Sequence, residues 1–355
     1  MKVLSLFDGM ACGAIALKTI GIEIETYDSY EIDQYAIQVA THNFPFIKQH
    51  GDVFKADFTK FAGVDLVCGG SPCTYWSIAQ KNNRETEASG MGWELFSQYV
   101  RAVNEAKPRF FIYENNYSMS AAIRESITKA FGFEPVCINS SLVSAQNRRR
   151  LYWVGKRNAD GTYSKVHVAL PEDRKVYLKD VINNAAANGN SIGVGYRNRR
   201  ELDGKLYRRF ETSGAEKANA LTTVQTDSMV AQAVCYRGRH AKDGKYFVNY
   251  EFRTDEKANA LVGNYTKALV IKTAIDGGPV YKVINGEIEI KGKQYKIKLP
   301  DGHYVIRNYT VDECKRLQTV PEWYDMSVIS NTRAYKCLGN GWTVAVIAHI
   351  LTELK

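Results

Sequence analysis

The chain has 355 residues, 45% of them hydrophobic, which is enough for a large and a smaller folded domain and excludes a disordered protein. No apolar run approaches the ~18 residues that a membrane-spanning helix needs. The formal net charge of +9 suits a phosphate backbone as partner, although many soluble proteins are equally basic.

The cysteines and the first residues indicate a reducing compartment inside the cell. The seven cysteines are odd in number and none has the Cys-x-x-Cys spacing, which argues against a disulfide framework and a zinc ribbon. The first apolar run is too short for a signal peptide and meets Asp8 at once. We therefore expect an intracellular protein in which one or two cysteines carry chemistry.

Residues 2 to about 155 alternate between strand and helix patterns. We expect strands over residues 3–7, 22–27, 64–68 and 110–113, and helices over residues 14–20, 33–41 and 93–105. This alternation predicts an α/β domain over residues 1–160, built on a doubly wound, mostly parallel sheet.

The rest of the chain has a different character. Tyr, Gly, Lys and Arg become frequent and short β-like runs appear, which predicts a second, smaller β-rich domain over residues 161–325. Residues 326–355 are predicted to return to the first domain, with a turn over 338–341 and a helix over 344–354.

An internal repeat lies in the β-rich region, where residues 196–221 recur as residues 236–261. Tyr196-Arg-Asn-Arg199 and Asp203-Gly-Lys205 correspond to Tyr236-Arg-Gly-Arg239 and Asp243-Gly-Lys245. Asp-Gly pairs are typical of hairpin turns, so the copies are predicted to be duplicated β units. The repeat is either purely structural or contacts nucleic acid, and we favour contact.

Polar residues follow each predicted strand of the first domain. They are Asp8-Gly9, then Asp28 and Glu31, then Gly70-Ser71-Pro72-Cys73, and finally Glu114-Asn115-Asn116. Ligands of doubly wound sheets bind beyond the carboxyl ends of the strands. We therefore expect one site at this edge of the sheet.

Three of these segments carry groups suited to catalysis. Cys73 follows Pro72 in a defined loop and would be a strong nucleophile as a thiolate, the alternative being an inert loop cysteine. Glu114 in a closed pocket could act as an acid. Arg148 and Arg150 would share one face of an extended strand and suit a phosphate or a pyrimidine carbonyl, the alternative being a solvated charge run.

The first turns indicate a nucleoside ligand without phosphates. The segment Phe7–Gly13 lacks the Gly-x-Gly-x-x-Gly spacing, which weakens a dehydrogenase interpretation. Glu31 could hold ribose hydroxyls, and Asp52 could accept from an adenine amino group. Both contacts suit an adenosine moiety.

Together these motifs resemble the DNA (cytosine-5) methyltransferase family, in the family's order and over nearly the whole chain. The matching segments are Phe7–Gly13, Tyr30–Asp33, Gly51–Phe54, Ser71–Cys73, Glu114–Asn116, Gln146–Arg150, Arg307–Pro321 and Tyr335–Asn340. One match alone is modest, but the ordered set is highly specific. Leu6–Gly9, Gly70–Cys73 and Trp342–His349 look like the animal de novo enzymes, whereas the long region 160–305 looks like the recognition domain of bacterial and phage enzymes, which is the origin we favour.

Two residues depart from the family pattern. Asn116 stands where the family usually has Val, and Gly341 stands where Ser usually follows Gly-Asn. The first is expected to change the packing around the target base, and the second to change contacts with the cofactor.

The resemblance implies a Rossmann-like fold and methyl transfer from S-adenosyl-L-methionine to C5 of a flipped cytosine in duplex DNA. Its catalytic residues would be Cys73 as nucleophile on C6, Glu114 as ring activator, and Arg148 and Arg150 on the cytosine carbonyl and a phosphate. The cofactor-binding residues would be Phe7, Asp8, Gly9, Gly13, Glu31, Ile32, Asp52, Val53, Pro72, Asn340 and Trp342. The DNA-binding residues would be Ser71, Arg197, Arg199, Arg237 and Arg239, with residues 161–325 as the target recognition domain.

The resemblance also implies partners and surroundings. We expect a monomer acting on double-stranded DNA in the cytoplasm of a bacterial or phage-infected cell, without metal or membrane, and with a cognate restriction endonuclease as a candidate partner. Three alternatives stay open: an RNA cytosine-5 methyltransferase of the same fold, a non-catalytic DNA-binding relative, and an enzyme that transfers a group larger than methyl. The long region 160–305 argues against the first, and the joint presence of the four catalytic residues argues against the second.

Overall fold

The chain forms two compact units. The computed structural model describes residues 1–77, 84–182, 191–200, 206–212, 218–219, 229–233, 235–240, 246–251, 280–290, 292–297, 299 and 301–354, with the backbone alone between 191 and 251 and at 179, 280, 302–303 and 305–307. The first unit comprises Met1–Ser144, Arg148–Arg174 and Gln318–Lys355, and the second comprises Ala145–Asn147 and Lys175–Leu317. The separate roles predicted for residues 1–160, 161–325 and 326–355 stay predictions.

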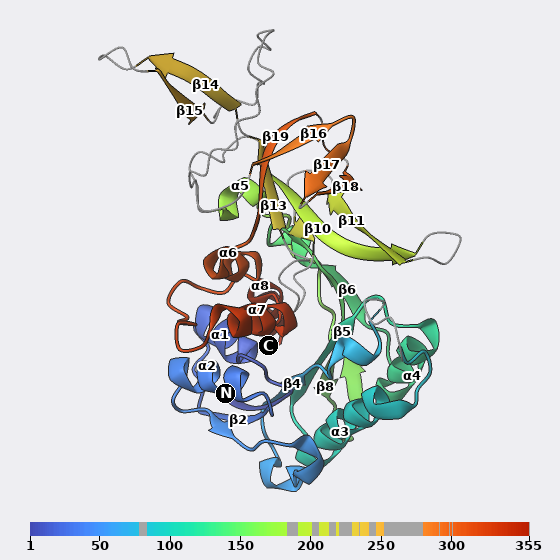
Figure 1. Ribbon diagram of the computed structural model, residues 1–355. Coiled ribbons are helices and arrows are strands. Elements are labelled where there is room, and N and C mark those ends of the chain that lie inside the picture. Colours follow the sequence, from blue (N-terminus) through green and yellow to red (C-terminus); the bar gives the residue numbers. More distant parts are fainter. Residues whose placement is uncertain are drawn as a thin grey trace. The chain divides into compact units, whose positions relative to one another are not determined.

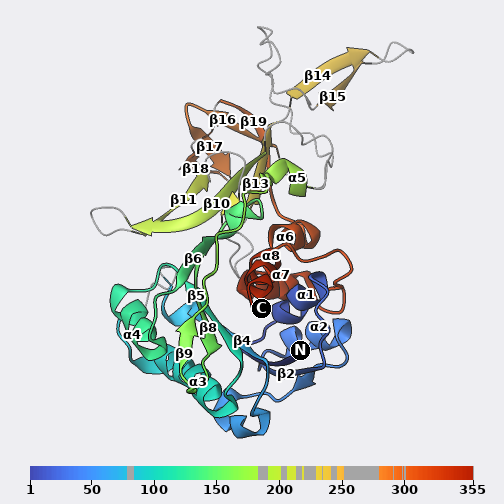
Figure 2. The same ribbon diagram turned by 180° about the vertical axis from the view of Figure 1, so that it is seen from behind.

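The first unit is built on an eight-stranded sheet with the order β3-β2-β1-β4-β5-β8-β6, and β9 pairs with β8. Figure 2 labels β2, β4, β5, β6, β8 and β9 of this sheet. Its strands are β1 (Lys2–Leu6), β2 (Thr26–Tyr30), β3 (Lys48–Gln49), β4 (Leu66–Gly69), β5 (Phe110–Asn116), β6 (Val136–Asn139), β8 (Arg149–Arg157) and β9 (Tyr163–Lys165). The pairs from β3 to β5 are parallel, and those made by β8 are antiparallel. The predicted doubly wound, mostly parallel sheet is confirmed.

The direction of winding reverses between β1 and β4. After β1 the chain forms β2, which pairs with one edge of β1. It later forms β4, which pairs with the opposite edge of β1. Leu6 is in register with Gly69, so the carboxyl ends of the two strands lie side by side. Ligands of doubly wound folds bind at this switch point.

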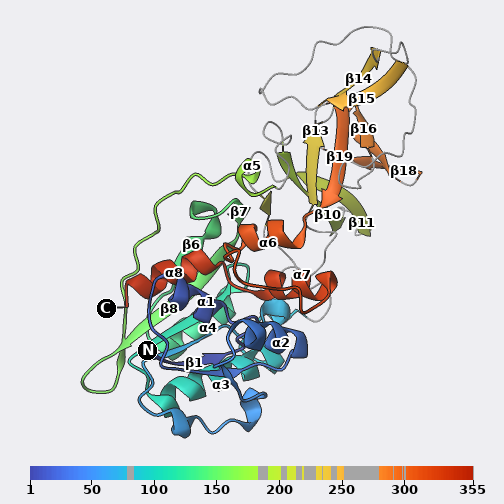
Figure 3. The same ribbon diagram turned by 90° about the vertical axis from the view of Figure 1, so that its left-hand side faces the viewer.

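Helices cover both faces of this sheet (Figure 1). They are α1 (Cys12–Thr19), α2 (Gln34–Asn43), α3 (Gly90–Ala106), α4 (Ala121–Phe131), α7 (Asn331–Asn340) and α8 (Val344–Thr352), with 3-10 turns η1 (Val53–Lys55), η2 (Phe58–Phe61), η3 (Cys73–Tyr75) and η4 (Ser140–Leu142). α3 and α4 lie on one face, and α1, α2, α7 and α8 on the other, where α1 packs against α8 (Figure 3). Within the described ranges, no helix is long and apolar enough to cross a bilayer.

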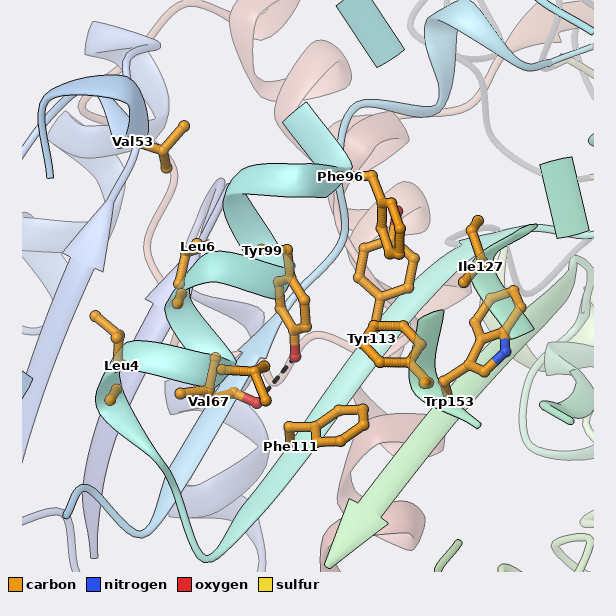
Figure 4. Close-up of a cluster of buried hydrophobic side chains, with 14 of the residues drawn as sticks. Leu4, Leu6, Val53, Val67, Phe96, Tyr99, Phe111, Tyr113, Ile127 and Trp153 are labelled. Carbon is orange, nitrogen blue, oxygen red and sulfur yellow. Dashed lines mark hydrogen bonds between the residues drawn. The ribbon is translucent and has the colours of Figure 1, made fainter. Parts of the chain in front are cut away.

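An aromatic core fixes α3 on the sheet (Figure 4). The phenol of Tyr99 on α3 donates to the carbonyls of Val67 (3.1 Å) and Ile112 (2.7 Å), which belong to neighbouring strands. Phe96 packs against Tyr113 with ring centroids 5.2 Å apart. These contacts bury large apolar areas and hold the ends of β4 and β5 in a fixed relation.

Most predicted elements are observed with their ends shifted by one to three residues, and three differ more clearly. β2 begins at Thr26 rather than at residue 22, because the chain turns at Gly21 (φ 73°) and its pairing with β1 starts only at the Lys2–Thr26 pair. β5 runs on to Asn116, because its last three residues pair with β8. Residues 338–340, predicted as a turn, form the last residues of α7.

The second unit is mainly antiparallel β-structure, which confirms the predicted β-rich region. Its largest sheet has the order β11-β10-β13-β19-β16-β17-β18. Its elements are β7 (Gln146–Asn147), α5 (Leu178–Val181), β10 (Ser191–Arg200), β11 (Leu206–Thr212), β12 (Ala218–Asn219), β13 (Met229–Ala233), β14 (Cys235–His240), β15 (Tyr246–Glu251), β16 (Val280–Ile284), β17 (Glu287–Ile290), β18 (Lys293–Lys296), β19 (Gly302–Asn308) and α6 (Val311–Leu317).

Both copies of the repeat contain an antiparallel strand pair. β10 pairs with β11 with Tyr196 opposite Phe210, and β14 pairs with β15 with Tyr236 opposite Tyr250. These pairs occupy matching positions in the two copies, as the predicted hairpins require. The Asp-Gly segments and residues 256–261 lie outside the described residues.

Candidate active site

The loop that carries Cys73 is tied to the neighbouring strand. β4 ends at Gly69, and Cys73 begins η3 three residues after Gly70. The hydroxyl of Ser71 lies 2.7 Å from the Tyr113 hydroxyl, and the amide of Asn115 donates to the Ser71 carbonyl at 3.2 Å. The loop therefore has a defined position at the carboxyl edge, where Cys73 is partly exposed.

The other described cysteines are poor sources of a thiolate. Burial raises the pKa of Cys12, Cys68 and Cys337 to about 12, and raises the pKa of Cys314 still further. Burial also raises the pKa of Cys137. Because only the thiolate is a strong nucleophile, these thiols fit a packing role.

Glu114 lies inside β5 rather than after it, and its carboxylate is held at both oxygens. The guanidinium Nε of Arg150 is 2.9 Å from Oε1, and the indole Nε1 of Trp342 donates to Oε2 at 2.9 Å. The residue is only 8% exposed. Arg150 compensates a buried negative charge that would otherwise be costly.

Arg148 and Arg150 do not stand on one unbroken strand, so that expectation is wrong. β7 ends at Asn147 and β8 begins at Arg149, because the Arg148 backbone N–H bonds to the Asn139 side chain instead. The Arg148 guanidinium is buried. Burial, with a smaller contribution from Arg150, lowers its pKa below its ordinary value.

The Arg148 guanidinium binds the end of α7. It donates to the carbonyls of Gly339 (3.2 Å) and Gly341 (3.0 Å). Its charge also interacts with Glu114 and Cys73. Arg148 therefore brings positive potential to the site while it holds the segment that precedes Trp342.

Each departure from the family pattern has a local structural consequence. The Asn116 amide donates to the Cys73 carbonyl at 3.4 Å, while its buried Oδ1 accepts no hydrogen bond from the residues that the structure describes. At Gly341, an added Cβ would stand 3.1 Å from the Cys337 carbonyl and 3.2 Å from the Cys12 sulfur. The space that a Ser side chain would use is therefore taken by Cys12.

The first turn is shaped for close approach by a ligand. Phe7 and Gly9 have φ angles of 55° and 57°, and the Cβ position of Gly9 faces open space. Asp8 turns inward, because its carboxylate accepts from the hydroxyls of Ser5 (2.6 Å), Tyr27 (2.7 Å) and Ser29 (3.0 Å). Burial raises the Asp8 pKa to about 6 despite these donors.

Glu31 joins two segments of the same edge. One oxygen accepts from the Gly9 backbone N–H and the other from those of Ile32 and Asp33, all at 2.8 Å. The Ile32 side chain is 77% exposed, which is unusual for an apolar residue beside a buried sheet. The carboxylate and the exposed apolar surface lie together where a nucleoside was predicted.

The segment after β3 offers a second apolar surface. Asp52 accepts from the Phe54 N–H at 3.0 Å, and Val53 is 5% exposed within the core. Phe54 is 43% exposed. Val53 therefore packs inside, and Phe54 presents the apolar surface here. Phe54 was not among the predicted cofactor-binding residues, although it stands inside the matched segment.

The remaining predicted cofactor-binding residues differ in their exposure to solvent. A Cβ on Gly13 would lie 2.9 Å from the Tyr27 hydroxyl, so this glycine serves the packing of α1 on β2. Pro72 and Asn340 are exposed, and Trp342 is partly exposed. Their contacts with a cofactor stay predictions.

The predicted DNA contacts are tested least by the structure. Ser71 is 3% exposed, with its hydroxyl bonded to Tyr113. Arg197 and Arg199 lie on β10, and Arg237 and Arg239 on β14, where only the backbone is described. No cluster of metal-ligating side chains occurs among the residues whose side chains are described.

The fold is that of solved methyltransferases. The Dnmt2 methyltransferase of S. pombe aligns with a TM-score of 0.55 at 12% identity, covering 100% of this chain and 98% of that chain. A mutant DNMT2 of Spodoptera frugiperda aligns with a TM-score of 0.57 at 15% identity, covering 99% of each. At such identities the likeness establishes the architecture alone.

Sequence comparison identifies the family. The model of the C-5 cytosine-specific DNA methylase family matches residues 1–355, so the chain belongs to that family, as the motifs predicted. The orphan methyltransferase M.Rho11sI of Bacillus phage rho11s is 34% identical over 169 residues, which are 44% of this chain and 33% of that relative. The chain thus matches about a third of that protein's length. The type II methyltransferase M1.ScrFI of Lactococcus lactis subsp. cremoris is 24% identical over 99% of this chain and 77% of its own length.

Proposed function

We propose that this chain transfers a methyl group from S-adenosyl-L-methionine to C5 of cytosine in double-stranded DNA. The observation that carries the proposal is that the loop with Cys73 packs against Glu114 at the carboxyl edge of the sheet, where Arg150 holds the Glu114 carboxylate. Family membership supports the same reaction. The ion pair of Glu114 with Arg150 and the partly exposed Cys73 are groups suited to a reaction on a polar ring.

The residues at the switch point fit the cofactor. Glu31 offers a carboxylate to ribose hydroxyls, and Ile32 and Phe54 offer exposed apolar surfaces to an adenine ring. Gly9 leaves open space beside the backbone for close approach. When bound, the cofactor supplies an electrophilic methyl group. Phe7, Asp8, Gly13, Asp52, Val53, Pro72, Asn340 and Trp342 complete the proposed site.

The target base must leave the duplex to reach Cys73, at a cost of a few kcal/mol. The Cys73 thiolate then adds to C6 of the ring, which makes C5 nucleophilic. Glu114 stabilises this step by protonating or hydrogen-bonding N3 and the amino group, and Arg150 holds the ring carbonyl. After C5 has taken the methyl group, loss of the C5 proton expels Cys73 as a thiolate.

Recognition of the DNA sequence is assigned to the second unit. Support comes from its β-structure, from the basic repeat, and from Arg197, Arg199, Arg237 and Arg239 at matching positions. Relatives from phages and from type II systems support a place in the cytoplasm of a bacterial or phage-infected cell and, as a candidate partner, a cognate restriction endonuclease. We propose that the chain acts as a monomer.

The decisive experiment combines labelled-methyl transfer with covalent trapping. The wild-type chain should methylate duplex DNA, and duplex DNA carrying 5-fluorocytosine should form an adduct on Cys73, because fluorine at C5 cannot leave as a proton. Cys73→Ala should bind DNA without transfer or adduct, whereas the matched variant Cys137→Ala should retain both.

Three results would overturn the proposal. Transfer to RNA alone would favour the RNA enzyme, DNA binding without any transfer would favour the non-catalytic relative, and an adduct on a cysteine other than Cys73 would remove the assigned nucleophile. Mass spectrometry of the product nucleoside identifies the transferred group directly.

A further inference from the structure

Trp342 contacts the proposed ring activator directly. Its indole N–H donates to Oε2 of Glu114 at 2.9 Å, although the two residues are 228 positions apart in the chain. Arg150 occupies the other oxygen at 2.9 Å. We propose that Trp342 is a positioning residue that orients the Glu114 carboxylate toward the target base, a role distinct from its contact with the cofactor; the inference rests on the proposed function.

The backbone around Trp342 is unusually well anchored. Arg148 donates to the Gly339 and Gly341 carbonyls, and the Gln318 amide donates to the carbonyls of Leu338 (2.7 Å) and Gly341 (3.3 Å). These bonds fix the peptide groups on the N-terminal side of the indole. A donor on such a support keeps its place when the site opens or fills.

The residue after Trp342 is anchored as well. The Thr343 hydroxyl donates to Oε1 of Gln318 at 2.9 Å, and the Ser140 hydroxyl donates to Thr343 at 2.8 Å. Thr343 is 1% exposed. Trp342 therefore stands between two buried hydrogen-bonded positions, which fix the backbone from which its indole reaches Glu114.

Two donors constrain a carboxylate more than one does. With Arg150 alone, the group can still turn about its last side-chain torsion, which is broad. A second donor on the other oxygen fixes the carboxylate plane and so the direction in which Glu114 meets a ring. Hydrogen bonds to charged groups are among the stronger ones in proteins, so loss of this bond should slow the chemical step roughly ten- to a hundred-fold.

The alternative is that Trp342 only lines the cofactor site. Trp342→Phe separates the two roles, because it keeps an aromatic ring and removes the N–H. We expect single-turnover methyl transfer at saturating cofactor to fall roughly ten-fold or more, with cofactor affinity changed less than about three-fold. Trp323→Phe is the matched control: Trp323 is 43% exposed and packs on Phe44 and Tyr324.

A double-mutant cycle tests whether Trp342 acts through Glu114. In a Glu114→Ala background, Trp342→Phe should slow adduct formation with 5-fluorocytosine DNA by no more than about three-fold, because the acceptor has gone. Equal losses in both backgrounds, or a loss explained by cofactor affinity, would overturn the inference. If Phe leaves a cavity, benzothienylalanine at position 342 keeps the shape of the ring and replaces only the N–H.

A spectroscopic readout keeps this test separate from the activity. The chain has five tryptophans, so ¹⁵N-labelled tryptophan gives a small set of indole signals. The Trp342 signal, assigned with Trp342→Phe, should move upfield in Glu114→Ala, while the Trp323 signal stays in place. An unmoved Trp342 signal would refute the inference even in an active enzyme. A chain without methyl transfer that still shows the shift would refute the proposed function alone.

Discussion

The Glu114 carboxylate lies so close to the backbone of Gly70 that a methyl group added at Gly70 would stand 2.8 Å from Oε2 and 2.6 Å from the Glu114 carbonyl oxygen. The absence of a side chain at residue 70 thus lets the Cys73 loop and β5 approach each other. The loop that carries Cys73, the proposed nucleophile, thus packs through Gly70 against Glu114, the proposed ring activator.

Gly70→Ala should damage the chemistry and the fold together. The added methyl group must push Glu114 away, and overpacking of this kind costs about 1–3 kcal/mol of unfolding free energy. Transfer per folded molecule should fall by roughly 10²-fold, the scale of lost general acid catalysis. Gly155→Ala is the control: its methyl group would overlap the Phe111 ring, so stability should fall while the transfer rate of the folded fraction is kept. Equal rates in both variants would contradict the prediction.

Asn115 and Asn116 should respond oppositely to replacement by Val. Asn115 is fully bonded: its amide donates to Ser71 and Tyr113, and its carbonyl oxygen accepts from the Asn116 N–H at 2.8 Å. Asn116 has only the 3.4 Å bond to Cys73, with Oδ1 buried and, among described residues, without a donor. An unsatisfied buried group costs about 1–3 kcal/mol.

Urea unfolding should therefore show that Asn116→Val gains about 1 kcal/mol and that Asn115→Val loses about 2 kcal/mol. Destabilisation of both variants to the same extent would mean that Asn116 is satisfied in solution. A slower transfer rate in a stabilised Asn116→Val would show that the chain gives up stability here for the position of the Cys73 loop.

The pH dependence of stability should carry the signature of Asp8. Burial raises its pKa from 3.8 to about 6, so the folded state keeps a proton that the unfolded state has already lost. Stability therefore falls as pH rises from about 4 to about 6 and is level above that range. In Asp8→Asn the decrease in unfolding free energy over this pH range should be smaller by about 1–3 kcal/mol, because a shift of one pKa unit corresponds to about 1.4 kcal/mol.

Asp57 is the control for Asp8, because its pKa is shifted in the opposite direction. The Thr59 hydroxyl lowers the pKa of the exposed Asp57, so that group stabilises the fold above its unfolded pKa and loses its effect only at lower pH. Asp57→Asn should leave the trend between pH 4.5 and 6.5 unchanged. Denaturant titrations across this range distinguish the two, and identical slopes for wild type and Asp8→Asn would contradict the assignment.

The positions of Cys73 and Glu31 could be predicted from the sequence. Both were placed at the carboxyl edge because each follows a buried apolar run, and the parallel order of the strands brings their ends together. Local pattern was sufficient there, since the periodicity that makes a strand also determines which edge its last residue reaches.

The contacts of Arg148 and Trp342 could not be predicted from the sequence. The direction of the Arg148 guanidinium depends on carbonyls 191 and 193 positions away. The strand breaks at Arg148 because its backbone N–H bonds to the Asn139 side chain. The Trp342 bond to Glu114 likewise joins distant segments. Such contacts arise from tertiary packing, and no local periodicity records them.

Cofactor affinity should depend on Glu31 and Asp52. Glu31→Ala removes both the proposed ribose acceptor and the bonds to Gly9, Ile32 and Asp33, so affinity by calorimetry should fall roughly ten-fold or more. Asp52→Ala should weaken binding less, because its one described bond is to the Phe54 N–H. Affinity unaltered in both variants would place the cofactor elsewhere on the sheet edge.

The repeated arginines of the second unit are proposed to read the DNA sequence. Arg197, Arg199, Arg237 and Arg239 occupy matching positions on β10 and β14. Arginine reads guanine in the major groove through a bidentate contact worth about 1–3 kcal/mol of discrimination. If these residues read bases, each Arg→Ala variant should relax the preference at one position of the methylated site, as mapped by base-resolution sequencing of modified cytosines.

Contacts to phosphates would give a different result. Loss of a phosphate contact weakens binding to all sequences alike and lowers the slope of log affinity against log salt by about one unit. Arg209 is the matched control: it lies opposite Arg197 in the first hairpin, whereas the second hairpin has Asn249 at the corresponding place. We expect Arg209→Ala to leave sequence preference intact. If the four repeated arginines behave like Arg209, the repeat is a scaffold and other residues of the second unit read the site.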